Sequence, residues 1–286
     1  MVSNTEDKLF QAVSYCILAI VGLAAVIPLL YVFSVSLTPF AEVLRHGGYV
    51  LFPKEITFNA YQKLIGTSTI PRSLGVTVYI TVVGTAINLI LTTLVAYPLS
   101  RKYLPGRSAF LVMVVFTLLF SGGIIPTYLV VKATGLIDSL WALILPTAVS
   151  SFNVLIMKSF FEQLPEELFE SARMDGAREF RILVQLTVPL SLPVMITVGL
   201  FYAVGHWNSF FSAIMYVTDR TLFPLQVVVR EILMLSQQPL ENAEDQVPTV
   251  TMQMAAVIFA SAPILAVYPF LQKHFTKGML LGSIKG

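Results

Sequence analysis

Apolar positions along this chain gather into long stretches that contain no charged side chain. A helix needs roughly 20 mostly apolar residues to cross a bilayer, so long uncharged runs of this kind predict membrane-spanning helices. Runs free of Asp, Glu, Lys and Arg occupy 9–41, 73–100, 108–131, 139–157, 182–218 and 246–272. Two further runs, 221–229 and 232–240, are too short to cross. The pattern therefore predicts six spans and an all-α membrane protein.

The predicted organisation is a single transmembrane domain over residues 1–286. The spans are expected at about 10–37, 73–99, 108–131, 139–159, 188–217 and 248–271, with a loop at 162–186 and a tail at 272–286. The third span contains Ser121-Gly122-Gly123-Ile124-Ile125-Pro126. Because glycine and proline weaken a helix, we expect the third span to kink or break there.

Composition supports a lipid environment and argues against several functions. Hydrophobic residues make up 56% of the chain and charged residues only 12%, about half the charged share of a soluble domain. A net charge of +2, spread along the chain, does not suggest a nucleic-acid partner. The chain has one cysteine, and no Cys/His group shows metal-ligand spacing.

Lysine and arginine give the orientation. If the N-terminus is cytoplasmic, the inside segments hold eleven of the 18 basic residues and the outside segments seven. Basic residues favour the cytoplasmic side of short loops. We therefore expect both termini, the loop 162–186 and the tail 272–286 in the cytoplasm.

The loop between the fourth and fifth spans carries an unusual concentration of acid. Six of the sixteen acidic residues lie there: Glu162, Glu166, Glu167, Glu170, Asp175 and Glu179. Its pattern predicts a short helix that starts near Pro165 and stops at Gly176.

An apolar stripe runs along this short helix. Leu164, Leu168 and Ala172 recur every four residues, while Glu170 and Arg173 can pair on the other side. An amphipathic helix in a loop lies on a membrane surface or in a partner's groove. The acidic first half favours a protein partner, because a membrane-surface helix is expected to be basic.

At this point the sequence resembles a known family. Glu170-Ser171-Ala172, three residues, Gly176, nine residues, Leu186, one residue and Val188-Pro189 is similar to the EAA signature of bacterial ABC importer permeases. The spacing matches throughout, while Ser171, Leu186 and Val188 depart mildly in residue type. The resemblance implies a type I ABC importer permease fold, in which this loop is a coupling helix that docks into an ATPase subunit.

Two further segments narrow the resemblance. The tail from Gln272 to Gly286 is similar to that of one permease of maltose-type oligosaccharide importers, which reaches the interface of two ATPases. The segments Phe120–Thr127 and Leu140–Pro146 resemble those of permeases in the branch of the family that includes the alginate importer. The resemblance therefore implies half of a pathway for an oligosaccharide, of an acidic, alginate-like kind, delivered by an extracytoplasmic binding protein.

The resemblance also implies partners and site residues. The expected partners are a second homologous permease, two copies of a cytoplasmic ATPase, the binding protein, the oligosaccharide and the lipid bilayer. No phosphate-binding loop occurs in this chain, so we expect no cofactor here and no enzymatic activity, with ATP and Mg on the ATPase. Expected coupling residues are Glu166, Glu167, Leu168, Glu170, Ala172, Asp175, Gly176, Ala177, Lys285 and Gly286.

Polar side chains within the spans are candidates for the substrate pathway, because buried polarity in lipid marks such pathways. The candidates are Asn88, Ser151, Asn153, Tyr202, His206, Trp207 and Asn208. Hydrogen bonds between helices, or an interfacial tryptophan, would explain the same residues. In the acidic outer segment 219–249, Gln237 and Gln238 are candidates for contact with the binding protein.

Other functions stay open at this stage. The solute of an ABC permease could be something other than a sugar. An ion-coupled secondary transporter would need charged groups within the spans, and the six runs contain none. A membrane-embedded hydrolase would need a nucleophile and a base at membrane depth, and His206 supplies at most half of that.

Overall fold

The computed structural model describes residues 5–235 and 249–283. These ranges form helices joined by turns and bends, and no strand occurs within them, so the all-α prediction is confirmed there. The chain divides into two compact units. One comprises residues 1–70 and 229–262, and the other comprises residues 71–228 and 263–286. Each unit is described by itself.

The first unit is built on a long N-terminal helix. Its complete helices are α1 (Thr5–Ser36), α2 (Phe40–Arg45) and α3 (Asn59–Gly66), followed by parts of α13 (Leu225–Leu235) and α14 (Val250–Ser283). The hydroxyl of Tyr31 donates to the carbonyl of Gly48 at 2.9 Å, and the hydroxyls of Ser36 and Tyr61 lie 2.8 Å apart. These bonds tie the end of α1 to the segment that follows it.

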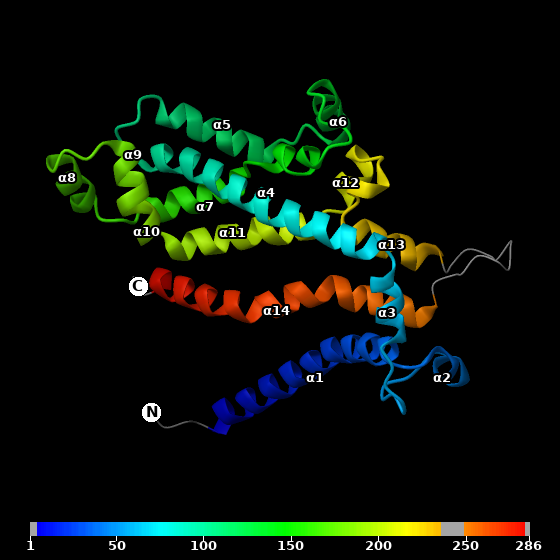
Figure 1. Ribbon diagram of the computed structural model, residues 1–286. Helices are drawn as coiled ribbons and strands as arrows, with labels where there is room; N and C mark the ends of the chain where they lie inside the picture. Colours follow the sequence, from blue (N-terminus) through cyan, green and yellow to red (C-terminus); the bar gives the residue numbers. More distant parts are fainter. Residues whose placement is uncertain (1–4, 236–248, 284–286) are drawn as a thin grey trace. The chain divides into compact units, whose positions relative to one another are not determined.

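The second unit holds most of the remaining helices. They are α4 (Thr69–Ser100), α5 (Arg107–Leu119), α6 (Ile124–Ala133), η1 (Leu140–Leu143), η2 (Leu145–Thr147), α7 (Ser151–Phe161), α8 (Glu166–Met174), α9 (Glu179–Ile182), η3 (Leu183–Thr187), α10 (Val188–Leu190), α11 (Leu192–Trp207), α12 (Phe211–Tyr216) and η4 (Arg220–Leu222). Helix α7 packs against both α5 and α11 (Figure 1).

Length and composition support six spans. Within residues 5–235 and 249–283, three helices are long and apolar enough to cross a membrane alone, at Phe10–Ser36, Thr69–Ser100 and Val250–Val267. Three bent pairs of helices are long and apolar enough when taken together, which brings the number to six if each pair is one span. The helix of the sixth span, α14, continues without a break to Ser283 and so includes most of the expected tail 272–286.

The break predicted in the third span is confirmed. Helix α5 ends at Leu119, α6 begins at Ile124, and the two helices are inclined by 114°. Gly123 has a φ of 85°, a conformation that side chains disfavour. Pro126 falls in the first turn of α6, where its missing N–H removes no helical hydrogen bond.

The fifth span differs from the prediction of one helix over 188–217. The chain bends by 84° at Ser191, between the segment Glu179–Leu190 and α11. Pro193 lies at the start of α11, where it cannot donate to the preceding turn. At the other end α11 stops at Trp207, and α12 is a separate short helix. Helix α11 alone is therefore shorter at both ends than the predicted span, and the fifth span counted above also includes the bent segment Glu179–Leu190.

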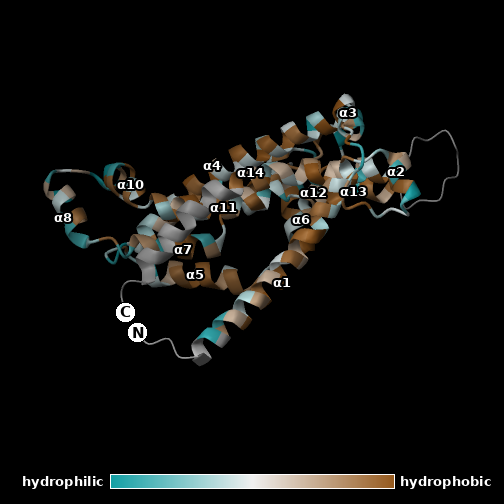
Figure 2. Cartoon of the chain, turned by 90° about the horizontal axis from the view of Figure 1, so that it is seen from below, coloured by the Kyte–Doolittle hydropathy of each residue, from teal (hydrophilic) through white to brown (hydrophobic). Residues whose placement is uncertain are grey.

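The short helix α8 lies at one end of the second unit, and α6 and α12 lie toward the other (Figure 1). Hydrophilic colours appear on α8, whereas α5 is mainly hydrophobic (Figure 2). The apolar core beneath α8 includes Tyr97, Phe161, Phe169 and Ile182, from four different helices. This core fixes α8 to the ends of the apolar helices.

Candidate functional site

Helix α8 begins and ends close to where the sequence predicts. It starts at Glu166, one residue after Pro165, with Glu166 and Glu167 in the first turn, where the helix dipole favours anions. At its end Gly176 has a φ of 77°. The N–H of Gly176 donates to the carbonyl of Arg173 at 3.0 Å, and that of Ala177 to Ala172 at 2.9 Å. This is the Schellman pattern of a helix stop, and the glycine turn is confirmed.

The residue that anchors α8 is Phe169, which the predicted stripe did not include. Its side chain has no exposed surface and packs in the core with Tyr97 and Phe161. Leu164 and Ala172 pack against the same core. Ala172 is thus partly covered by its own chain, and contact of Leu168 and Ala172 with a partner's groove stays a prediction.

Other apolar side chains of this region remain exposed. Leu168 is 40% exposed, Met174 82% and Phe180 71%. The carboxylates of Glu167, Glu170 and Asp175 are exposed in the same segment, and Ala177 is partly buried. Exposed apolar groups beside charges are typical of a surface that binds another protein. Met174 and Phe180 are large apolar residues in an otherwise polar loop, and this feature of the sequence could have identified them as part of such a surface.

Among the described residues Arg173 makes two ion pairs, and neither is with Glu170. Its Nη1 lies 3.5 Å from Glu166 Oε1, and its Nε lies 3.1 Å from Glu179 Oε1. The predicted pair with Glu170 is therefore wrong, and the Glu170 carboxylate is left facing outward. The reason is that the turn at Gly176 brings Glu179 back alongside α8.

The contacts around Arg173 shift the pKa values of Arg173 and of Tyr103. Arg173 Nη2 donates to the hydroxyl of Tyr103 at 2.9 Å. Burial acts to lower the pKa of Arg173, but its hydrogen bonds with Glu179 and Tyr103 outweigh burial and raise it. Burial raises the pKa of the Tyr103 phenol, and the Glu179 carboxylate raises it further. Both groups stay protonated at neutral pH, so the contacts persist.

A second ionic cluster fixes the start of the same loop. Glu162 accepts a hydrogen bond from Arg107 and lies 2.7 Å from the Nζ of Lys158. The Nε of Arg107 also donates to the carbonyl of Leu99 at 2.8 Å. The loop that carries α8 is thus tied to the ends of α4, α5 and α7.

Five of the predicted pathway residues line one polar cleft in the second unit, with a volume of about 390 Å³. They are Asn88, Asn153, Tyr202, His206 and Asn208. Asn88 Nδ2 lies 3.0 Å from His206 Nε2 and 3.2 Å from the carbonyl of Thr147. Its Oδ1 is buried and has no hydrogen-bond partner among the described residues.

Tyr202 occupies the centre of a second set of hydrogen bonds in this cleft. Its hydroxyl accepts from the N–H of Ser150 at 3.0 Å and lies 2.7 Å from Thr92 Oγ1. Phe201, Phe210 and Phe211 also line the cleft. Among its described lining residues there is no Asp, Glu, Lys or Arg. Amides, hydroxyls and aromatic rings can hold the hydroxyl groups and faces of sugar rings.

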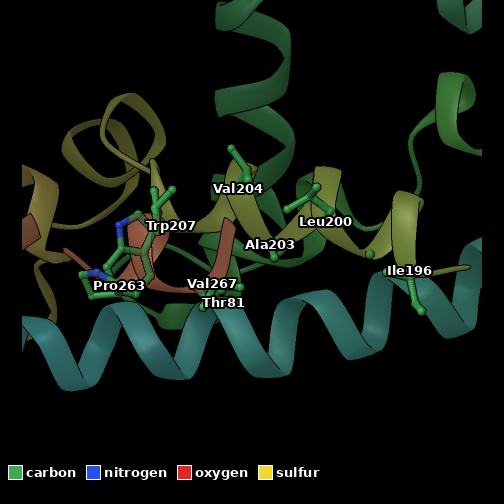
Figure 3. A pocket seen from close by; sticks show the side chains of 10 residues that line it. Thr81, Ile196, Leu200, Ala203, Val204, Trp207, Pro263 and Val267 are labelled. Atoms are coloured by element: carbon green, nitrogen blue, oxygen red, sulfur yellow. The ribbon is translucent and has the colours of Figure 1, made fainter. Parts of the chain in front are cut away.

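Trp207 and Ser151 are not among the residues that line this cleft. Trp207 lines an apolar cavity of about 410 Å³ with Leu200, Val204, Pro263 and others (Figure 3). Ser151 Oγ lies 2.8 Å from Thr117 Oγ1, on α5. The predicted polar group therefore separates into a cleft, a residue of an apolar cavity, and a contact between helices.

Four predicted site residues lie outside the described ranges. They are Gln237, Gln238, Lys285 and Gly286.

Comparison with known proteins gives close relatives. The sequence profile of the family described as "Binding-protein-dependent transport system inner membrane component" matches residues 3–281. Protein LplC of Bacillus subtilis (strain 168) is 46% identical over 99% of this chain and 97% of its own. The polygalacturonan/rhamnogalacturonan transport system permease protein YtcP of the same organism is 43% identical over 98% of this chain and 100% of its own.

A solved structure has the same fold. One chain of a bacterial ABC transporter involved in the import of the acidic polysaccharide alginate superimposes with a TM-score of 0.88 and 30% sequence identity. The match covers 95% of this chain and 98% of that chain.

Proposed function

This chain belongs to the family of binding-protein-dependent transport system inner membrane components, and from that premise we propose that it forms half of the pathway of an oligosaccharide importer. Membership confirms the type I ABC importer permease fold and a multi-pass position in the inner membrane. It also excludes the secondary transporter and the membrane hydrolase considered from the sequence.

The observation that carries the proposal is the form of the loop around α8. Phe169 fixes the helix to the chain's own core, while Leu168, Met174 and Phe180 stay exposed beside carboxylates. Such a rigid, partly apolar projection suits docking into a cleft of another protein. We propose that this partner is the cytoplasmic ATPase, which binds ATP and Mg and hydrolyses the nucleotide, and that both termini lie on its side of the membrane.

The proposed substrate is an acidic oligosaccharide. Two similar proteins support this choice: a permease for polygalacturonan/rhamnogalacturonan and a transporter of the acidic polysaccharide alginate. The cleft beside Asn88, Tyr202 and His206 offers neutral hydrogen-bonding groups. We propose that it contacts sugar hydroxyls and that the second permease supplies the charge complementary to the acid groups.

The proposed assembly contains this chain, a homologous permease and two ATPase copies, and it receives substrate from a binding protein. Gln237 and Gln238 are proposed contacts of that binding protein. Replacing both with bulky residues should weaken stimulation of ATPase activity by the loaded binding protein. Unchanged stimulation would argue against this contact.

Native mass measurement of the purified complex tests the assembly. A transport-active complex without a second permease or without an ATPase would overturn it. For the substrate, ATPase stimulation is measured with binding protein offered acidic oligosaccharides, neutral oligosaccharides and non-sugar solutes. Stimulation by the acidic set alone is expected, and stimulation only by a neutral sugar or a non-sugar solute would contradict the proposed class.

A further inference from the structure

Arg101, at the end of α4, is a buried cation whose surroundings come largely from α8. The residue is 3% exposed. Its guanidinium carbon lies 3.6 Å from the centre of the Phe169 ring, on α8, and 4.9 Å from the centre of the Tyr97 ring, on α4. An arginine over an aromatic face is attracted by the ring, and the attraction strengthens when water is excluded.

Few other groups compensate the charge of Arg101. Its Nη1 lies 3.6 Å from Glu166 Oε2, again on α8. Its Nε and Nη2 are buried and have no hydrogen-bond partner among the described residues. Removing the partner of a buried charge is strongly unfavourable, so Arg101 resists separation of α8 from α4.

Besides its pair with Arg101, Glu166 is connected to α4 by a second series of contacts. Glu166 also pairs with Arg173 at 3.5 Å, and Arg173 pairs with Glu179 at 3.1 Å. The hydroxyl of Tyr97 donates to Glu179 Oε2 at 2.6 Å. The contacts therefore form a closed ring, and we name its members the clasp: Tyr97, Arg101, Glu166, Arg173 and Glu179, together with Phe169, whose ring lies against the Arg101 guanidinium.

We infer that the clasp makes α8 and the end of α4 move as one body, so that α4 receives the motion of the coupling helix directly. The covalent chain alone would pass that motion to α7 and, through α9 and α10, to α11. The residues of the clasp are thus positioning residues for coupling. This inference rests on the proposed function of α8.

Helix α4 leads from the clasp to the polar cleft. Thr92 and Asn88 lie on it, and they contact Tyr202 and His206. Arg101 directly follows the last residue of α4 and lies nine positions after Thr92, about 14 Å at the usual helical rise. A shift of α8 would therefore reach the hydrogen bonds of the cleft through one stiff helix.

The test uses the complete complex in proteoliposomes, with its binding protein. Phe169→Leu removes the ring but keeps a somewhat smaller apolar side chain, and Phe169→Tyr keeps the ring. Arg181→Gln is the matched control, since Arg181 is an exposed arginine of the same loop whose Nε donates to Gln185 and which lies outside the clasp. ATP hydrolysis and sugar uptake are measured on the same vesicles.

The clasp predicts that Phe169→Leu keeps ATP hydrolysis but transports at least about tenfold less sugar per ATP, the effect of losing one desolvated cation–aromatic contact. Phe169→Tyr and Arg181→Gln should retain the normal ratio. A merely structural role would lower hydrolysis and uptake in proportion to the amount of complex. An unchanged ratio in Phe169→Leu would overturn the inference.

A second measurement does not depend on transport. Hydrogen exchange of the α8 amides in the purified complex should be faster in Phe169→Leu and in Tyr97→Phe than in Arg181→Gln. Equal exchange in all three variants would overturn the clasp, even if the proposed function holds. If the wild-type complex imports no sugar, the proposed function fails, and the exchange data still decide whether α8 is held to α4.

Discussion

The ring of His206, on α11, lies directly against Gly84, on α4. A methyl group placed on Gly84 would lie 2.6 Å from His206 Nε2 and 2.8 Å from Cε1, distances that real side chains do not tolerate. The same Nε2 is the atom that lies 3.0 Å from Asn88. The absence of a side chain at Gly84 thus allows the contact between His206 and Asn88 in the polar cleft.

Gly84→Ala should therefore displace His206 and weaken the packing of α4 on α11. We expect a loss of stability of roughly 1–3 kcal/mol, as for other insertions into packed sites, together with reduced transport. Thermal unfolding of the detergent-purified complex and an uptake assay measure the two effects. Gly75→Ala is the control on the same helix, because no atom of the described residues lies within 4 Å of the added carbon. Equal behaviour of the two variants would contradict the assigned contact.

The spans could be predicted because they depend on a local property, the absence of charge over a long run. The break near Gly123 was also predictable, since Gly122, Gly123 and Pro126 all weaken the helix locally. The bend at Ser191 was not predicted, although Pro189 and Pro193 flank it. Proline occurs in several other spans without such a bend, so its effect depends on how the neighbouring helices pack.

The candidate site was predictable in outline but not in its contacts. The acidic residues and Gly176 marked the helix and its stop. Phe169 packs against Arg101, which is 68 residues away in the sequence and entered the prediction only as one of the basic residues that set the orientation. Likewise the pairing of Arg173 with Glu179 arises only once the chain has turned at Gly176. Contacts between distant segments leave no local pattern to read.

The two adjacent glycines at the break of the third span should differ in their tolerance of substitution. Gly123→Ala forces a side chain into a backbone with φ of 85° and should cost roughly 1–3 kcal/mol. Gly122→Ala should be mild, because the added carbon makes only an ordinary contact at 3.8 Å with Pro126. The amount of inserted protein and its unfolding temperature measure both. A Gly122 variant as damaged as the Gly123 variant would contradict the explanation by backbone conformation.

Gly176 should be replaceable only by residues that accept a left-handed backbone. Its φ is 77°, and in the described part of the chain nothing lies within 4 Å of an added carbon, so the cost of substitution is conformational. Gly176→Val should cost about 1–2 kcal/mol or more, distort the turn after α8 and reduce transport. Gly176→Asn should retain most activity, because asparagine populates this conformation. Uptake at matched expression compares the two, and equal loss in both would indicate a role for the glycine other than its backbone.

Glu170 should bind the ATPase, because its carboxylate is exposed on α8 and Arg173 pairs with Glu166 and Glu179 instead of with it. Glu170→Lys changes no contact of the clasp and lies outside the spans, so the protein should insert normally. If Glu170 faces a basic residue of the partner, reversing its charge should cost about 2–5 kcal/mol of binding, enough to release the ATPase or stop transport. Glu55→Lys reverses another exposed carboxylate, on the opposite side of the membrane in the proposed orientation, and should have no such effect. Co-purification of the ATPase and sugar uptake decide the matter, and normal values for Glu170→Lys would exclude this contact.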